Sequence, residues 1–248
     1  MSCMKVTVIG SWGAYPEKGE ATSCYLVETQ TEKWLLDCGS GALSCLPEFV
    51  RLEEIDRIFI SHRHTDHTAD AGAFVYSRLV AQALGSTDRP VHIYAPAEER
   101  AWLNSIVKEK AAVAHTYESG DSWMIDDVTW SFHRTAHPVP CWALRLEENN
   151  AALCYTADAV YDESLVNFAS GASLLIAEAS FYEDQPAADY GHMTSTEAGR
   201  LAEKAGAQEL WLTHFPHFGN RSDLVMEAEK VYRGNVSTAE KGKSKRIG

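Results

Sequence analysis

The sequence lacks any run of about 18 apolar residues, the length that a membrane-spanning helix needs. Its first residues also lack the charged and long apolar regions of a secretory signal peptide. None of its six cysteines forms a CxxC pair, so neither a disulfide framework nor a cysteine zinc site is expected. We therefore expect a cytoplasmic protein, with no membrane association and with reduced, mostly buried thiols. The cysteines are Cys3, Cys24, Cys38, Cys45, Cys141 and Cys154.

Positive charge is also scarce. Lys and Arg number 22 against 35 Asp and Glu, which gives the 248 residues a net charge of −13. A protein that grips nucleic acid usually presents a basic face to the phosphates. The charge balance therefore disfavours nucleic acid as a partner. The basic residues that do cluster, Lys241, Lys243, Lys245 and Arg246, lie in a polar terminal segment.

Strand and helix signals alternate in the first and last parts of the chain around a β-rich middle. No repeat or linker divides it, so we expect one α/β domain over residues 1–248, with a flexible tail from about 235 to 248. Expected strands cover 5–9, 23–28, 33–37, 57–60, 91–94, 123–125, 128–133, 141–146, 152–155, 174–177 and 209–212. Expected helices cover 69–84, 96–108, 194–205 (opened by a capping box) and 220–232.

One segment dominates the chemistry. Three imidazoles and a carboxylate fall within six residues, directly after an apolar strand: His62, His64, Asp66 and His67. Side chains two apart in an extended chain point to one side, so His62 and His64 can share an ion. Asp66 and His67 follow as the chain turns toward a helix, where they can face a second ion.

This segment resembles the H-x-H-x-D-H motif of the metallo-β-lactamase-fold hydrolases. The family's other motifs recur in order, at Asp37 with Gly39, at His137, at Asp158 and at His214. The resemblance implies an αββα sandwich, in which two mixed sheets are flanked by helices, and a binuclear metal site. It would place one ion on His62, His64 and His137, the other on Asp66, His67 and His214, with Asp158 bridging.

Nitrogen and oxygen ligands without cysteine suit two divalent ions, Zn²⁺ first and Mn²⁺ as the alternative. Two such ions hold a bridging hydroxide and stabilise charge on the attacked centre. Asp37 is expected to form the turn or support a ligand rather than bind metal. His92, His115 and His133 match no motif and are expected to be structural.

Two later segments are similar to those of tRNase Z and its relatives: the strand ending in Glu178, and the loop that carries His192. The resemblance implies that Glu178 orients His192, which protonates the leaving oxygen. Ala177 stands where those enzymes usually have His. The tRNA-gripping arm of tRNase Z is missing, because only residues 138–157 separate His137 from Asp158, enough for a hairpin. The sequence therefore resembles the short bacterial metallo-β-lactamase-fold hydrolases that are related to tRNase Z and lack the arm.

The preferred function is a binuclear phosphodiesterase for a small or cyclic phosphodiester. Its metal-bridging hydroxide would attack phosphorus, with Asp66 orienting or deprotonating it. The alternative is a lactone, thioester or ester hydrolase with the same metal pair, and a third option is a non-catalytic binding protein. A related diiron redox branch carries Glu at the position of His64. The presence of His64 here therefore favours hydrolysis over electron transfer. The partner is a small molecule rather than tRNA, and a homodimer is an open option for the assembly.

Overall fold

The computed structural model describes residues 4–108 and 110–248, so Cys3 lies outside the described residues. The chain divides into two compact units. The N-terminal unit holds Met4–Glu118 and Glu240–Lys245, and the C-terminal unit holds Ser119–Ala239 and Arg246–Gly248. Our expectation of a single domain over residues 1–248 stays a prediction.

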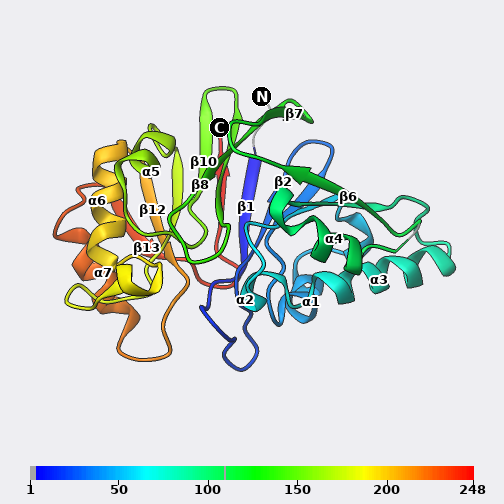
Figure 1. The fold of residues 1–248 in the computed structure, drawn as a ribbon, viewed down its shortest axis with the longest axis horizontal. Helices are drawn as coiled ribbons and strands as arrows, with labels where there is room; N and C mark the ends of the chain where they lie inside the picture. The colour runs from blue at the N-terminus through cyan, green and yellow to red at the C-terminus, as the bar shows by residue number, and fades with distance from the viewer. Residues whose placement is uncertain (1–3, 109) are drawn as a thin grey trace. The chain divides into compact units, whose positions relative to one another are not determined.

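The N-terminal unit is built on a seven-stranded mixed sheet of order β14-β1-β2-β3-β4-β5-β6. Strands β1 to β3 pair antiparallel, and β3 to β6 pair parallel. The strands are β1 (Met4–Gly10), β2 (Cys24–Glu28), β3 (Lys33–Leu36), β4 (Arg57–Phe59), β5 (Val91–Pro96), β6 (Ala112–Tyr117) and β14 (Ser244–Ile247). The helices of this unit, labelled in Figure 1, are α1 (Ala42–Cys45), α2 (Thr65–Thr68), α3 (Ala71–Ala83) and α4 (Arg100–Ile106). Short 3-10 turns are η1 (Leu46–Glu48), η2 (Leu52–Glu54) and η3 (Ala97–Glu99).

The core of this unit lies between the sheet and its helices. Ile58 and Ile93 on adjacent parallel strands face the same buried cluster as Phe74 and Val75 of α3. Burial of such side chains is worth about 1.5–3 kcal/mol each. This packing fixes the end of β4, from which the histidine-rich segment departs.

The C-terminal unit contains the second seven-stranded mixed sheet, of order β13-β12-β11-β10-β9-β8-β7. Strands β7 to β10 form an antiparallel meander, and β10 to β13 pair parallel. The strands are β7 (Ser122–Ile125), β8 (Val128–Arg134), β9 (Trp142–Glu148), β10 (Ala151–Tyr155), β11 (Leu174–Glu178), β12 (Glu209–Thr213) and β13 (Asn235–Thr238). Helices α5 (Glu163–Phe168), α6 (Ser195–Ala205) and α7 (Arg221–Glu229) flank this sheet on the left of Figure 1, and η4 (Ala187–Tyr190) is a 3-10 turn.

Residues 138–157 form the expected hairpin. Strands β9 and β10 pair with Glu148 opposite Ala151, and the two turn residues, Asn149 and Asn150, both have positive φ. Two-residue hairpin turns need such angles, and asparagine tolerates them well. The segment between His137 and Asp158 is therefore filled by a tight hairpin, with no extended arm.

Helix α6 starts as the sequence predicts. The Thr194 side chain accepts a hydrogen bond from the Glu197 N–H, and the Glu197 carboxylate accepts one from the Thr194 N–H. This capping box satisfies two backbone donors that would otherwise lack partners. It also fixes the chain direction just after His192.

The flexible tail predicted from about residue 235 is wrong. Strand β13 pairs with β12, and β14 is the edge strand beside β1. The Val8 N–H donates to the Lys243 carbonyl at 2.9 Å, and the Gly242 N–H donates to the Val8 carbonyl at 2.8 Å. These partners lie more than two hundred residues apart in the sequence, so no local pattern reveals the pairing.

Within residues 4–108 and 110–248, every helix is too short or too polar to cross a membrane. The five described cysteines are buried.

Candidate metal centre

The four residues of the histidine-rich motif lie together in the N-terminal unit. After β4 the chain stays extended through His64, whose φ and ψ are −60° and 149°. It then turns into α2, which carries Asp66 and His67 in its single turn. His62 and His67 are fully buried, and Asp66 is 8% exposed. The change from strand to helix thus gathers residues that are close in sequence but differ in backbone conformation.

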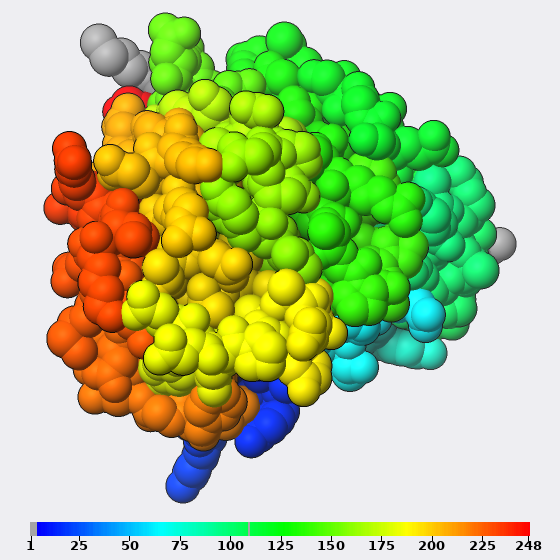
Figure 2. All heavy atoms as spheres, turned by 60° about the vertical axis from the view of Figure 1, so that its left-hand side comes forward, coloured from blue at the N-terminus to red at the C-terminus, as the bar shows by residue number. Residues whose placement is uncertain are grey.

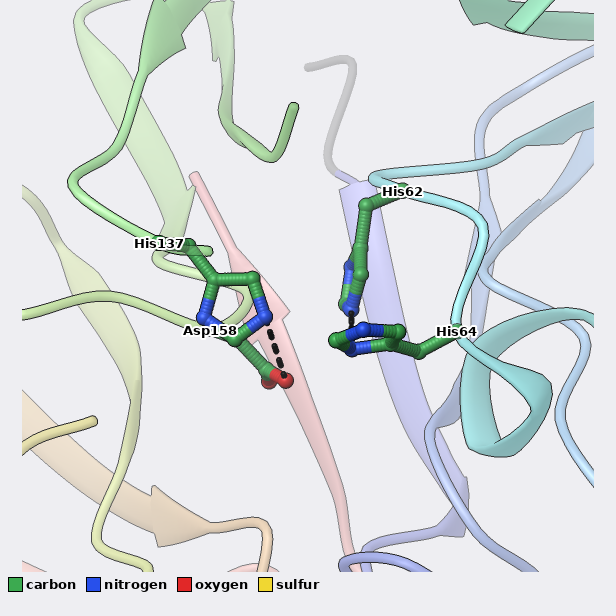
Figure 3. A group of neighbouring side chains, drawn as sticks. All are labelled: His62, His64, His137 and Asp158. Carbon is green, nitrogen blue, oxygen red and sulfur yellow. Dashed lines mark hydrogen bonds and ion pairs between the residues drawn. The ribbon is translucent and has the colours of Figure 1, made fainter. Parts of the chain in front are cut away.

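His62 and His64 point toward one another, as Figure 3 shows. The His62 Nε2 atom lies 3.0 Å from the His64 Nδ1 atom. Two imidazole nitrogens on one tetrahedral zinc ion stand roughly 3.3 Å apart, given Zn–N bonds of about 2.0–2.1 Å. The pair is therefore close to the spacing that a shared ion requires, in agreement with the extended-chain argument.

Asp37 stabilises this cluster through hydrogen bonds. Its Oδ2 atom accepts a hydrogen bond from His67 Nδ1 at 2.7 Å, and both side chains are fully buried. The same carboxylate accepts the Ser61 backbone N–H at 2.7 Å and the Ser61 hydroxyl at 2.8 Å. A histidine that donates from Nδ1 presents Nε2 as its ligand atom. Asp37 has a φ of 58°, so it also makes the turn after β3.

Asp66 is oriented by the backbone. Its Oδ2 atom accepts the Ala14 N–H at 2.8 Å and lies 3.9 Å from His67 Nε2. A carboxylate oxygen and an imidazole nitrogen at this separation can bind one ion or ions next to each other. The N-terminal unit therefore presents three imidazoles and a carboxylate in a preformed, largely buried arrangement.

The remaining predicted ligands lie in the C-terminal unit. His137 follows β8, Asp158 follows β10 and His214 follows β12. Strands β10 to β12 are parallel, so residues just past their carboxyl ends meet at one edge of the sheet. His214 Nε2 lies 3.4 Å from Asp158 Oδ1, and His137 Nε2 lies 3.9 Å from Asp158 Oδ2 (Figure 3). Asp158 thus has one histidine at each carboxylate oxygen.

Both of these histidines are held through Nδ1. His137 Nδ1 lies 2.9 Å from the Gly191 carbonyl oxygen, to which it can only donate. His214 Nδ1 lies 2.8 Å from the Ser180 hydroxyl. Such contacts fix the ring orientation and leave Nε2 directed at Asp158, the arrangement found in protein metal sites.

His192 completes this cluster. Asp158, His192 and His214 each offer one ligand atom within 4.8 Å of the others, a group with metal-binding geometry. The His192 ring stacks on the His214 ring with centroids 5.4 Å apart. His192 is therefore beside the predicted ligands, as a proton donor or as a ligand.

Glu178 contacts the His192 ring. This carboxylate is fully buried at the end of β11, and its Oε1 atom lies 3.0 Å from His192 Nδ1. The same oxygen accepts the Ala159 N–H at 2.8 Å. The two side chains that we predicted as a pair are therefore in contact, and their roles stay predictions.

Ser180 contacts the candidate site and was not predicted from the sequence. Its hydroxyl donates to Glu178 Oε2 at 2.5 Å, lies 2.8 Å from His214 Nδ1, and lies 3.5 Å from His192 Nδ1. One hydroxyl thus links a predicted ligand to the predicted acid pair. Its position two residues after Glu178 was the available signal, but a serine after a strand is too common to be singled out.

The three histidines that we expect to be structural contact residues that are not predicted ligands. His92 Nδ1 lies 2.9 Å from His115 Nε2 on neighbouring strands, and His115 stacks on Tyr94. His133 Nε2 lies 3.0 Å from the Ser164 hydroxyl. Burial lowers the pKa of all three rings, with further lowering from Arg57 at His92 and from His92 and Arg57 at His115.

Comparison with known proteins adds a family assignment. Residues 33–215 match the model of the β-lactamase superfamily domain. The sequence is 39% identical to the probable metallo-hydrolase YhfI of Bacillus subtilis, over 96% of this chain and 98% of that protein. It is also 27% identical to ribonuclease Z of a Synechococcus species, over 94% of this chain and 96% of that protein.

Solved structures agree on the fold. The crystal structure of Bacillus subtilis YhfI has a TM-score of 0.96 at 38% identity, with 98% of this chain and 99% of that chain covered. The short form of human tRNase Z has a TM-score of 0.78 at 23% identity, with 97% and 98% covered. The expected metallo-β-lactamase fold, with two mixed sheets flanked by helices, is confirmed.

Proposed function

The chain belongs to the β-lactamase superfamily and is a metallo-hydrolase, and we propose that it is a binuclear phosphodiesterase acting on a small or cyclic phosphodiester. The observation that carries the proposal is the contact of the buried Glu178 with His192, beside a cluster of metal-type ligands in the same unit. A metal site alone suits many hydrolytic reactions. A carboxylate-supported imidazole suits protonation of a poor leaving group such as an alkoxide.

The donor set fits divalent metal ions. All seven predicted ligands offer imidazole nitrogen or carboxylate oxygen, and His67, His137 and His214 are each held through Nδ1. We propose that one ion takes His62, His64 and His137, that the other takes Asp66, His67 and His214, and that Asp158 serves both. When bound, two such ions activate water and offset the negative charge of a phosphate. We propose zinc, with manganese as the alternative.

His192 acts as the proton donor in this proposal. Water attacks phosphorus, the bond to the leaving oxygen breaks, and His192 gives that oxygen a proton. Glu178 holds His192 Nδ1 at 3.0 Å, which directs Nε2 away from the carboxylate and toward substrate. An imidazolium carries a proton on each ring nitrogen, so Nε2 can donate while Nδ1 stays bonded to Glu178. Glu178 is thus a positioning residue, and His192 is the catalytic acid.

Asp66 orients the attacking water. The Ala14 N–H fixes its Oδ2 atom at 2.8 Å, which sets the direction of the carboxylate. An ionised carboxylate accepts protons from water and can remove one as the bond to phosphorus forms. Asp66 therefore serves as both ligand and base.

Three observations favour a small substrate over tRNA. The −13 charge leaves little basic surface for a polyanion. The β9–β10 hairpin fills the segment where an arm would be inserted. The alignment with the Synechococcus ribonuclease Z spans 308 positions, whereas this chain has 248 residues. At least 60 positions of the alignment are therefore residues of that relative with no counterpart in this chain.

A substrate panel tests the proposal. We expect metal-loaded enzyme to hydrolyse bis(p-nitrophenyl) phosphate or a cyclic nucleotide, with little or no cleavage of precursor tRNA. His62→Ala, which removes a predicted metal ligand, is the matched control for hydrolysis by contaminating enzymes. Hydrolysis of a lactone or thioester without phosphodiesterase activity would replace the proposal with the alternative. Site-specific cleavage of precursor tRNA would contradict the small-substrate assignment.

A further inference from the structure

Tyr190 is an exposed aromatic residue at the end of η4, two residues before His192. Its side chain is 61% exposed. The ring stacks on Phe181, with centroids 5.5 Å apart and planes 17° apart. The segment that carries it, in yellow, forms part of the surface in Figure 2. Tyr190 thus presents one supported aromatic ring to solvent.

The supporting ring is itself next to the proposed acid. The Phe181 and His192 ring centroids are 5.9 Å apart. Phe181 therefore contacts both Tyr190 and His192, and all three rings belong to one aromatic cluster in the C-terminal unit. A ring bound against Tyr190 would join the same aromatic cluster as His192, with Phe181 between Tyr190 and His192.

The backbone under Tyr190 is well defined. The His192 N–H donates to the Ala187 carbonyl at 3.1 Å, which closes the η4 turn. Gly191 has a φ of 84°, and its carbonyl accepts the hydrogen bond from His137 Nδ1. A Cβ at Gly191 would come within 2.2 Å of Pro138 Cδ, so the close approach requires glycine. The position of Tyr190 is thus tied to that of a predicted metal ligand.

Exposed aromatic rings beside a phosphate-processing group are suited to stacking on a heterocyclic base. The chain offers little positive charge of its own for the phosphates, so stacking would add binding energy to that of the proposed metal ions. We propose that Tyr190 stacks on a nucleobase, so that the substrate is a mononucleotide-type phosphodiester. This inference rests on the proposed phosphodiesterase function and narrows its substrate class.

Binding of two phosphate esters that differ only by the base tests the inference. Adenosine 5′-monophosphate and ribose 5-phosphate are titrated calorimetrically into the metal-loaded enzyme and its variants. We expect the nucleotide to bind roughly 5- to 150-fold more tightly, the range given by one base–aromatic stack. Tyr190→Ala should remove that preference without changing the affinity for ribose 5-phosphate, whereas Tyr190→Phe should keep it. Tyr76→Ala, which removes a tyrosine of similar exposure (58%) on α3, should change neither affinity.

The outcomes separate this inference from the function on which it rests. Equal affinities in the unaltered enzyme, or a base preference that survives Tyr190→Ala, would overturn the stacking role even if bis(p-nitrophenyl) phosphate is hydrolysed. Absence of both phosphate-ester binding and phosphodiesterase activity would overturn the proposed function, and the stacking role with it. A thermal midpoint unchanged in Tyr190→Ala shows that the variant is folded.

Discussion

Glu178 Oε1 and His192 Nδ1 lie 3.0 Å apart, in a contact between a fully buried carboxylate and a ring at the edge of the candidate metal site. The carboxylate also accepts the Ala159 N–H and the Ser180 hydroxyl. Its charge is therefore compensated by three donors rather than by water. This relationship couples the end of β11 to the loop before α6, and the proposed acid depends on it.

Replacement of His192 by Ala tests the proton donor. We expect metal content to stay unchanged and turnover of a substrate with an alkoxide leaving group to fall by roughly 10²–10⁴-fold. The loss should shrink for bis(p-nitrophenyl) phosphate, because nitrophenolate leaves without a proton. Steady-state kinetics with both substrates, together with elemental analysis, makes the comparison.

Two results would contradict this assignment. Equal losses for good and poor leaving groups would mean that His192 does not donate a proton. Loss of one ion per chain would place His192 among the metal ligands, which its position near Asp158 and His214 allows geometrically.

Ser180→Ala tests the hydroxyl that links Glu178 to His214. Removal of a group that supports a metal ligand typically costs about 10–100-fold in metal affinity or activity. We expect a loss of that size in kcat, with the fold intact by circular dichroism. Ser164→Ala removes a comparable contact to His133, at 3.0 Å, and serves as the control. Equal activity in the two variants would show that Ser180 has no part in the site.

The His92–His115 pair predicts acid sensitivity of the fold. Burial lowers the pKa of both rings, so near pH 6.5 the unfolded chain binds protons that the folded chain does not. The free energy of unfolding should therefore fall as the pH drops below about 6.5. Urea unfolding at pH 7.5 and 5.5 should show a smaller change in the variant that carries both His92→Gln and His115→Gln. An identical pH dependence in this variant would assign the acid sensitivity to other groups.

The C-terminal strand predicts unequal effects of two neighbouring substitutions. Ile247 is 2% exposed, whereas Arg246 is exposed. Ile247→Ala should lower the free energy of unfolding by about 2–5 kcal/mol. Arg246→Ala should change it by less than about 0.5 kcal/mol. Equal, small effects in urea unfolding would indicate a flexible tail after all.

The local parts of the fold could be predicted from the sequence. The Thr194 capping box depends on residues three positions apart, and it starts its helix in the structure. The segment 138–157 is long enough for a hairpin but not for an extended arm, and the structure has a hairpin there. Such features are encoded within a few residues, so pattern and turn chemistry reveal them.

Long-range pairing could not be predicted. Strand β6 is not among the expected strands, and it pairs parallel with β5 in the N-terminal sheet. Strand β14 lies beside β1 although its sequence, Ser-Lys-Arg-Ile, is mostly polar. An edge strand with charged side chains resembles a solvated terminus by composition, and only its distant partner distinguishes the two.

The candidate site also combines residues that sequence motifs reveal with a residue that only three-dimensional contacts reveal. The resemblance to the metallo-β-lactamase-fold hydrolases implied all seven metal ligands, and the resemblance to tRNase Z implied the Glu178–His192 pair. Their roles stay predictions. Ser180 could be recognised only once β11 and β12 brought it against His214. A hydroxyl has no characteristic spacing, so its role depends on three-dimensional contacts.

The most direct test of the central claim is a Zn²⁺ titration of the metal-free enzyme, followed by hydrolysis of bis(p-nitrophenyl) phosphate. A binuclear phosphodiesterase predicts that activity rises with added metal and reaches its plateau at about two ions per chain. Full activity at one ion per chain, or no phosphodiesterase activity at any ratio of metal to protein, would contradict the account.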